Sequence, residues 1–113
     1  MGIQMSDHTP DKWLVVKLTN KQDEVHYRVF ACWYGGYLGS DTWQLNSGIA
    51  NVCLVDDFYK FSGSSGSLYH CHKDGYGASG YGHGVLNKLI KDAVELTIEI
   101  MPKETDFLKL EIV

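Results

Sequence analysis

The chain has 113 residues and carries 14 acidic against 10 basic side chains, a formal net charge of −4. This length supports a single domain around one hydrophobic core. The negative balance and the single arginine, Arg28, argue against a protein that binds duplex nucleic acid, because such proteins carry a basic face. Every apolar run is shorter than the ~18 residues that a membrane-spanning helix needs, so we expect no membrane partner.

The cysteines and the N-terminus predict a cytoplasmic protein with reduced thiols. Cys32, Cys53 and Cys71 are odd in number and widely spaced, which does not fit a disulfide framework. No apolar segment of the signal-peptide type precedes Trp13.

The first third of the chain predicts a hairpin behind a short lead-in. Residues 1–11 have no periodic apolar positions and are predicted as a disordered lead-in to a single α+β domain over residues 12–113. Apolar and polar residues then alternate over residues 13–19 and again over residues 25–33, which indicates two antiparallel strands.

The middle of the chain predicts three more strands. They cover residues 42–45, 49–61 and 68–72, and the serine- and glycine-rich residues 62–67 are predicted as a loop. The single strand over 49–61 would place Asp56 and Asp57 on opposite faces, so they would not share a site.

The last third predicts the one helix. Residues 75–84 hold five glycines and are predicted to be too flexible for a regular element, whereas apolar residues recur at helical spacing over residues 85–93, with Ser79 as a possible N-cap. Residues 94–101 alternate as a strand, with a continued helix as the alternative, and residues 108–112 alternate as a final strand. The predicted class is α+β, a mostly antiparallel β-sheet with one helix near the C-terminus.

Glycines and tyrosines are concentrated where a ligand would be expected. Eleven of the 12 glycines lie between Gly35 and Gly84, together with five of the 7 tyrosines. Glycine exposes backbone N–H donors, and aromatic rings offer stacking surfaces, which predicts a site for a small anionic, nucleotide-like ligand. The alternative is that the glycines serve turns and the tyrosines fill the core. The predicted ligand-binding residues are Arg28, Trp43, Tyr69, Tyr76, Gly77, Tyr81, Gly82 and His83.

Arg28 is the predicted anchor for the ligand's charge. A guanidinium within a sheet needs a carboxylate, a phosphate or a stacked ring. An internal salt bridge to Asp41, Asp56 or Asp57 is the alternative.

The run His70-Cys71-His72 raises the possibility of a metal site or a hydrolase. On a strand, His70 and His72 share one face and could hold zinc with His83, Cys53 or His26 as a third ligand. The standard spacing of zinc modules is missing, so we predict no metal, no cofactor and no catalytic residue. A metal-dependent or thiol hydrolase stays open as an alternative.

Three segments, WQLNSGI (43–49), SGSLYHC (65–71) and YGHGVL (81–86), resemble small phage and prophage proteins. The chain is similar in style to anti-defence sponges such as Thoeris anti-defence proteins, which sequester host cyclic-nucleotide immune signals as oligomers without cleaving them. The resemblance implies a non-enzymatic phage-type accessory protein that acts in the host cytoplasm, and it assigns no individual site residue.

Two further expectations concern partners. The net acidity and the surplus of Tyr and Trp leave open an inhibitor that binds a host enzyme, because these rings are favoured interface anchors. We also expect a homo-oligomer, since a chain of this size buries a modest core and a second copy would cover an open strand edge.

Overall fold

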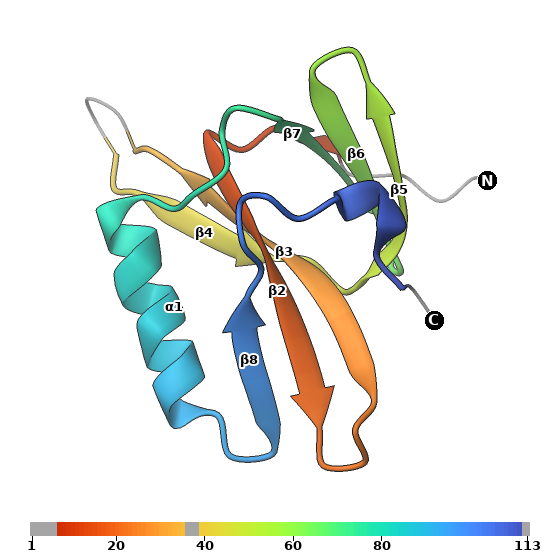
Figure 1. The fold of residues 1–113 in the computed structure, drawn as a ribbon. Helices are drawn as coiled ribbons and strands as arrows, with labels where there is room; N and C mark the ends of the chain where they lie inside the picture. The colour runs from red at the N-terminus through yellow and green to blue at the C-terminus, as the bar shows by residue number, and fades with distance from the viewer. Residues whose placement is uncertain (1–6, 36–38, 112–113) are drawn as a thin grey trace, which may run out of the picture.

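The computed structural model describes residues 7–35 and 39–111, which form two sheets and one α-helix (Figure 1). The first, sheet I, has the order β4-β3-β2-β8, and the second, sheet II, has the order β1-β7-β6-β5. The strands of sheet I are β2 (Lys12–Asn20), β3 (Val25–Trp33), β4 (Thr42–Leu45) and β8 (Leu96–Ile100). Those of sheet II are β1 (Asp7–His8), β5 (Ile49–Val55), β6 (Phe58–Gly63) and β7 (Leu68–His72). The predicted α+β class is confirmed, and the helix α1 (Gly80–Asp92) precedes the last strand.

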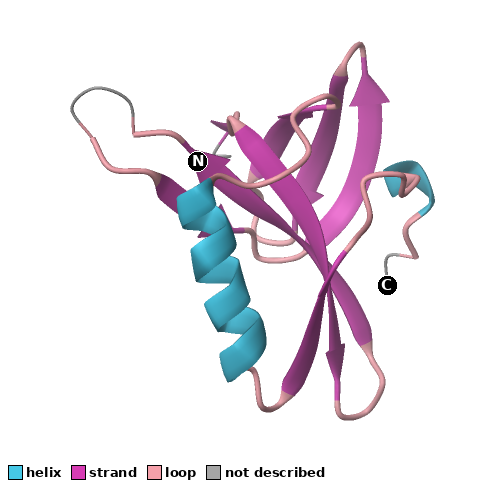
Figure 2. Ribbon diagram, turned by 60° about the vertical axis from the view of Figure 1, so that its left-hand side comes forward, coloured by secondary structure: helices cyan, strands magenta, loops and turns pink. Residues whose placement is uncertain are grey.

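The central strands of sheet I, β2 and β3, are covered on both faces, whereas β4 and β8 are largely exposed. The helix α1 covers one face, and sheet II lies beyond the other (Figure 2). Strand β2 contributes to both layers, because alternate side chains point to opposite faces: Val15 packs toward sheet II and Val16 toward α1.

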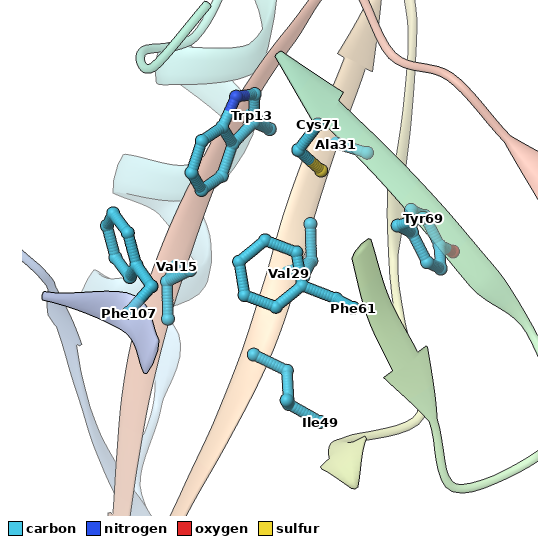
Figure 3. Packing of buried hydrophobic residues seen from close by; sticks show 9 residues of the cluster. All are labelled: Trp13, Val15, Val29, Ala31, Ile49, Phe61, Tyr69, Cys71 and Phe107. Carbon is cyan, nitrogen blue, oxygen red and sulfur yellow. The ribbon is translucent and has the colours of Figure 1, made fainter. Parts of the chain in front are cut away.

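The core between the sheets is mostly aromatic and β-branched (Figure 3). Its buried members are Trp13, Val15, Val29, Ala31, Ile49, Phe61, Tyr69, Cys71 and Phe107. The indole of Trp13 lies 5.5 Å from the ring of Phe61 and 5.3 Å from that of Phe107, centroid to centroid. These contacts join β2, β6 and the segment after β8 in one packed layer.

Residues 49–61 form a hairpin, so the prediction of one long strand is wrong. Strands β5 and β6 pair antiparallel and are joined by Asp56 and Asp57. Asp56 has a φ of 56°, a left-handed conformation that aspartate tolerates and that suits a tight hairpin turn. Apolar residues flank Asp56 and Asp57 on both sides, and the predicted strand runs through this acidic pair, although Asp is a favoured turn residue.

The end of the predicted lead-in belongs to the fold. Asp7 and His8 pair in parallel with β7, and the ring of His8 stacks on Tyr69 at 4.7 Å. Two residues are too few for a pattern, so only the neighbouring strand defines β1. Residues 1–6 lie outside the described residues.

The helix begins five residues earlier than its apolar pattern. Ser79 is its N-cap, as predicted, and its Oγ accepts a hydrogen bond from the backbone N–H of Gly82 at 3.0 Å. Residues 80–84 are therefore helical, contrary to the prediction for the glycine-rich run. Within the described part of the chain, no helix has the length and apolar character to cross a membrane.

The chain after α1 follows one prediction and departs from another. The strand β8 confirms the strand interpretation over the continued helix. Where a strand was predicted over residues 108–112, the described residues form a 3₁₀ turn, η1 (Phe107–Lys109), capped by Asp106, and residue 112 lies outside the described residues. Phe107 is buried in the core at 3% exposure. Burial of this one ring decides the conformation, although Leu108 and Leu110 alternate like a strand.

Candidate functional site

The predicted ligand-binding residues are distributed over separate parts of the molecule. Arg28 lies in β3, Trp43 in β4 and Tyr69 in β7. Tyr76 and Gly77 follow β7, and Tyr81, Gly82 and His83 form the first turn of α1. The structure brings these residues to both faces of sheet I and does not gather them around one cavity.

Tyr69 and Tyr76 belong to the protein interior. Tyr69 is 0% exposed between the sheets (Figure 3). Tyr76 donates from its hydroxyl to the carbonyl of Met101 and accepts from the N–H of Val15 at 3.3 Å. Burial raises the pKa of both phenols. These rings fill the core, in agreement with the alternative for the tyrosines.

The backbone N–H groups of Gly77, Gly82 and His83, which belong to the predicted ligand-binding set, donate hydrogen bonds within the protein. The N–H of Gly77 donates to the carbonyl of Trp13 at 2.8 Å. The N–H of Gly82 donates to the hydroxyl of Ser79, and the N–H of His83 donates to the carbonyl of Ser79 at 2.8 Å. These donors are satisfied by the chain itself.

Two rings of the predicted set remain exposed. Trp43 is 37% exposed and stacks on Phe30 at 5.5 Å, and Tyr81 is 51% exposed. Trp43 lies opposite Cys32 in the sheet, and Gly82 packs against the sulfur of the same Cys32, so β4 and the first turn of α1 are neighbours.

Arg28 lines a cavity of about 360 Å³ beside β3. Arg28 is half-buried, and no carboxylate of the described residues forms an ion pair with it, so the alternative salt bridges to Asp41, Asp56 or Asp57 do not form. The lining includes a guanidinium, an imidazole and two serine hydroxyls, and it contains no acidic residue. It consists of His26, Arg28, Ser47, Gly48, Ile49, Ala50 and Ser64.

A buried asparagine positions the loop that forms one wall of this cavity, which we call the Arg28 pocket. The side-chain oxygen of Asn46 accepts from the N–H of Val29 at 2.8 Å, and the N–H of Asn46 donates to the carbonyl of Val29 at 3.0 Å. This pair of bonds attaches the loop to β3 at the residue next to Arg28. Gly48 then takes a φ of +135°, a turn that suits glycine.

The serine-rich loop after β6 forms another wall of the Arg28 pocket through Ser64. The N–H of Ser64 donates to the carbonyl of Gly48 at 2.9 Å, and the N–H of Ser65 donates to the hydroxyl of Ser47 at 3.0 Å. The hydroxyl of Ser64 lies 3.1 Å from that of Ser47. The two loops are thus tied together, with both hydroxyls at the pocket. The sequence analysis did not assign His26, Ser47 or Ser64 to an anion site, although it predicted the loop over residues 62–67 that holds Ser64.

A second cavity, of about 410 Å³, lies on the outer face of sheet II. Its lining mixes both signs of charge: Asp7, Thr9, Val55, Asp56, Phe58, Lys60 and His70. The Nε2 atom of His70 lies 3.9 Å from a carboxylate oxygen of Asp7. Because acids offset its bases, this larger cavity suits an anion less well than the Arg28 pocket.

The His70-Cys71-His72 run does not place its thiol beside its imidazoles. His70 and His72 point outward from sheet II, and Cys71 is 0% exposed in the core, where burial raises the pKa of its thiol well above the usual range. His83 lies on α1, beyond sheet I. Among residues 7–35 and 39–111, no group of three or more His, Cys, Asp or Glu could hold a metal ion.

Comparison of the chain with protein-family models, with curated proteins and with solved structures found no match.

Proposed function

We propose that the protein is a non-enzymatic binder of a small anionic ligand, which it holds through a phosphate or carboxylate group in the Arg28 pocket. The observation that carries the proposal is a half-buried arginine with no carboxylate partner in the described chain, in a pocket without acidic lining. A guanidinium presents a planar set of donors that matches a phosphate or a carboxylate. The hydroxyls of Ser47 and Ser64 supply further donors.

The dimensions of the pocket support a small ligand. Its volume of about 360 Å³ falls within the ~300–1,000 Å³ that is usual for ligand sites. His26 contributes the only ring to the lining, and Tyr69 and Tyr76 are inside the core. The pocket therefore supports the binding of an anionic group. That the ligand also carries a nucleotide-like base stays a prediction from the sequence.

The biological setting also stays a prediction. A phage protein that sequesters a host nucleotide signal needs only tight binding, and an arginine without a carboxylate partner among the described residues is suited to provide it. The alternative of a protein that inhibits a host enzyme stays open beside it, on the exposed rings of Trp43 and Tyr81.

Calorimetric titration with inorganic pyrophosphate and with cyclic nucleotides tests the proposal. We expect the Arg28→Gln variant to bind about 10–100-fold more weakly, because a hydrogen bond to a charged group contributes ~1.5–3 kcal/mol. Arg28→Lys keeps the charge but not the two-pronged geometry, and should bind with intermediate affinity.

Lys60→Gln is the matched control, because it removes a positive charge from the second cavity. It should leave the affinity unchanged. No heat with any of these anions, or equal binding by the wild type and Arg28→Gln, would overturn the proposal.

A further inference from the structure

The strand β5 is an open edge without the usual protection. It is the last strand of sheet II, and its outer side has no backbone hydrogen bond to the described part of the chain. Its sequence, IANVCLV, contains no charged residue and no proline. Proteins normally protect an exposed edge by charge, proline or shortness.

The other described edges are protected. Strand β1 has 2 residues and β4 has 4, and β8 carries Glu99. Strand β5 is longer, with 7 residues, and five of these are exposed. Leu54 and Val55 are each 43% exposed, on opposite faces of the sheet.

The register of the hairpin defines which backbone groups of β5 are open. Val55 and Phe58 flank the two-residue turn and are a hydrogen-bonded pair in such a hairpin. Because hydrogen-bonded and non-bonded pairs alternate, Cys53 also bonds to β6, whereas Val52 and Leu54 direct their N–H and C=O groups outward.

We propose that β5 pairs antiparallel with β5 of a second copy of this chain around a two-fold axis at Cys53, which makes one continuous eight-stranded sheet from four strands of each copy. A register irregularity between Ile49 and Asn51 restricts the regular strand to residues 51–55, and Cys53 is its midpoint. Asn51 then lies opposite the partner's Val55, and Val52 opposite the partner's Leu54.

The charge distribution allows a second copy to pair at β5. Two chains of net charge −4 repel each other, yet β5 contributes no carboxylate to the contact. The two acidic turns, at Asp56 of each copy, lie at opposite ends of the paired strands, about 20 Å apart at ~3.4 Å per residue. That separation exceeds the screening length of ~8 Å at physiological salt.

The ends of the interface are complementary. One residue beyond the regular strand, the acidic turn at the partner's Asp56 comes near Ala50, which lines the Arg28 pocket. The carboxylate of that turn is complementary in charge to Arg28, and in the dimer it would compete with the anionic ligand of the proposed function. The pairing does not rest on the proposed function, because association is measured without ligand.

Light scattering after size exclusion tests the pairing. At about 100 µM the wild type should have twice the 12.7-kDa mass of the chain. Leu54→Lys should weaken association by about tenfold or more, because it places a charge in an apolar interface. Circular dichroism establishes that the variant is folded.

Leu96→Lys is the matched control. Leu96 is 39% exposed on the edge of sheet I, and this variant should associate like the wild type. A monomeric wild type, a dimer that Leu54→Lys leaves intact, or a dimer that Leu96→Lys weakens equally would overturn the pairing.

Oxidation tests the register. Cys53 and the partner's Cys53 would form a non-hydrogen-bonded pair with Cα atoms about 4.5 Å apart, within the ~4.4–6.8 Å range of disulfides. With added diamide, which takes up the two electrons and two protons of the thiols, we expect a covalent dimer that reductant reverses and that Cys53→Ser abolishes. A non-covalent dimer that forms no such bond would overturn the register.

Discussion

The hydroxyl groups of Tyr69 and Tyr76 have different surroundings, although both residues pack in the core. The hydroxyl of Tyr69 is buried without a hydrogen-bond partner among the described residues. That of Tyr76 bridges Val15 and Met101, and so links β2 to the chain after β8. An unpaired buried hydroxyl costs free energy, whereas a paired one contributes to stability.

The variants Tyr69→Phe and Tyr76→Phe therefore have different expected effects on the free energy of unfolding. Tyr69→Phe should leave it unchanged or raise it by up to about 1 kcal/mol, because an unsatisfied group is removed. Tyr76→Phe should lower it by about 1–2 kcal/mol, because the partners at Val15 and Met101 are left unpaired. Urea unfolding measures both, and a larger loss for Tyr69→Phe than for Tyr76→Phe would contradict the assignment.

At the residue scale, the sequence singled out Arg28 but not its neighbours. Its single occurrence in mid-strand is visible in the sequence. Ser47 and Ser64 line the same pocket only because two loops, 17 residues apart, are hydrogen-bonded to each other. Composition could not distinguish an aromatic ring in the core from one at a ligand, which is why Tyr69 and Tyr76 were misplaced.

The docking of α1 on sheet I depends on a missing side chain. A Cβ atom at Gly82 would lie 2.4 Å from the sulfur of Cys32, which is 1% exposed. At Gly84, two residues on in the same helix, a Cβ would have no neighbour within 4 Å. The missing side chain of Gly82 therefore allows α1 to approach sheet I closely. A side chain at Gly84 would not obstruct this approach.

Alanine substitutions separate packing from helix propensity at these two glycines. Gly82→Ala should destabilise the protein by about 1–3 kcal/mol through overpacking. Gly84→Ala should stabilise it by up to ~1 kcal/mol, because alanine is the better helix former. Thermal unfolding compares them, and Cys32→Ala should recover part of the loss in Gly82→Ala. Equal effects at both positions would rule out the contact with Cys32 as the cause.

At the element scale, periodicity predicted most strands but not the places where the chain turns. The bounds of β3, β4 and β7 agree with the apolar alternation. The hairpin at Asp56 and the turn at Phe107 were missed, because the apolar residues that flank each turn predict a strand. In each case a local backbone conformation is selected by pairing or burial elsewhere in the molecule.

The core of the molecule contains thiols and phenols that stay protonated to higher pH in the folded protein than in the unfolded chain. Burial raises the pKa of the thiols of Cys32 and Cys71 and of the phenols of Tyr69 and Tyr76. Unfolded thiols ionise near their ordinary value of 9.0. Above that pH the native state binds more protons than the unfolded state, so the free energy of unfolding falls as the pH rises.

Urea unfolding between about pH 7 and pH 11 should show this decline, since each retained proton contributes up to ~1.4 kcal/mol per pH unit. Below about pH 8 these groups are protonated in both states and should add no slope. The Cys71→Ala variant should decline less steeply than the wild type, even though it starts from a lower stability. Identical slopes for the two proteins would show that Cys71 does not contribute.

The sequence by itself determined the α+β class, the strands with clear alternation and the N-cap at Ser79. It also singled out Arg28, whose role as the anchor of a ligand stays a prediction. These features depend on local spacing, capping chemistry and the count of residue types, all of which are present along the chain. Only the tertiary structure decided that Tyr69 fills the core, that Asp56 turns the chain and that Ser47 and Ser64 line one pocket with Arg28. Burial and long-range pairing decide such features, because the free energy of a side chain depends on neighbours that are distant in sequence.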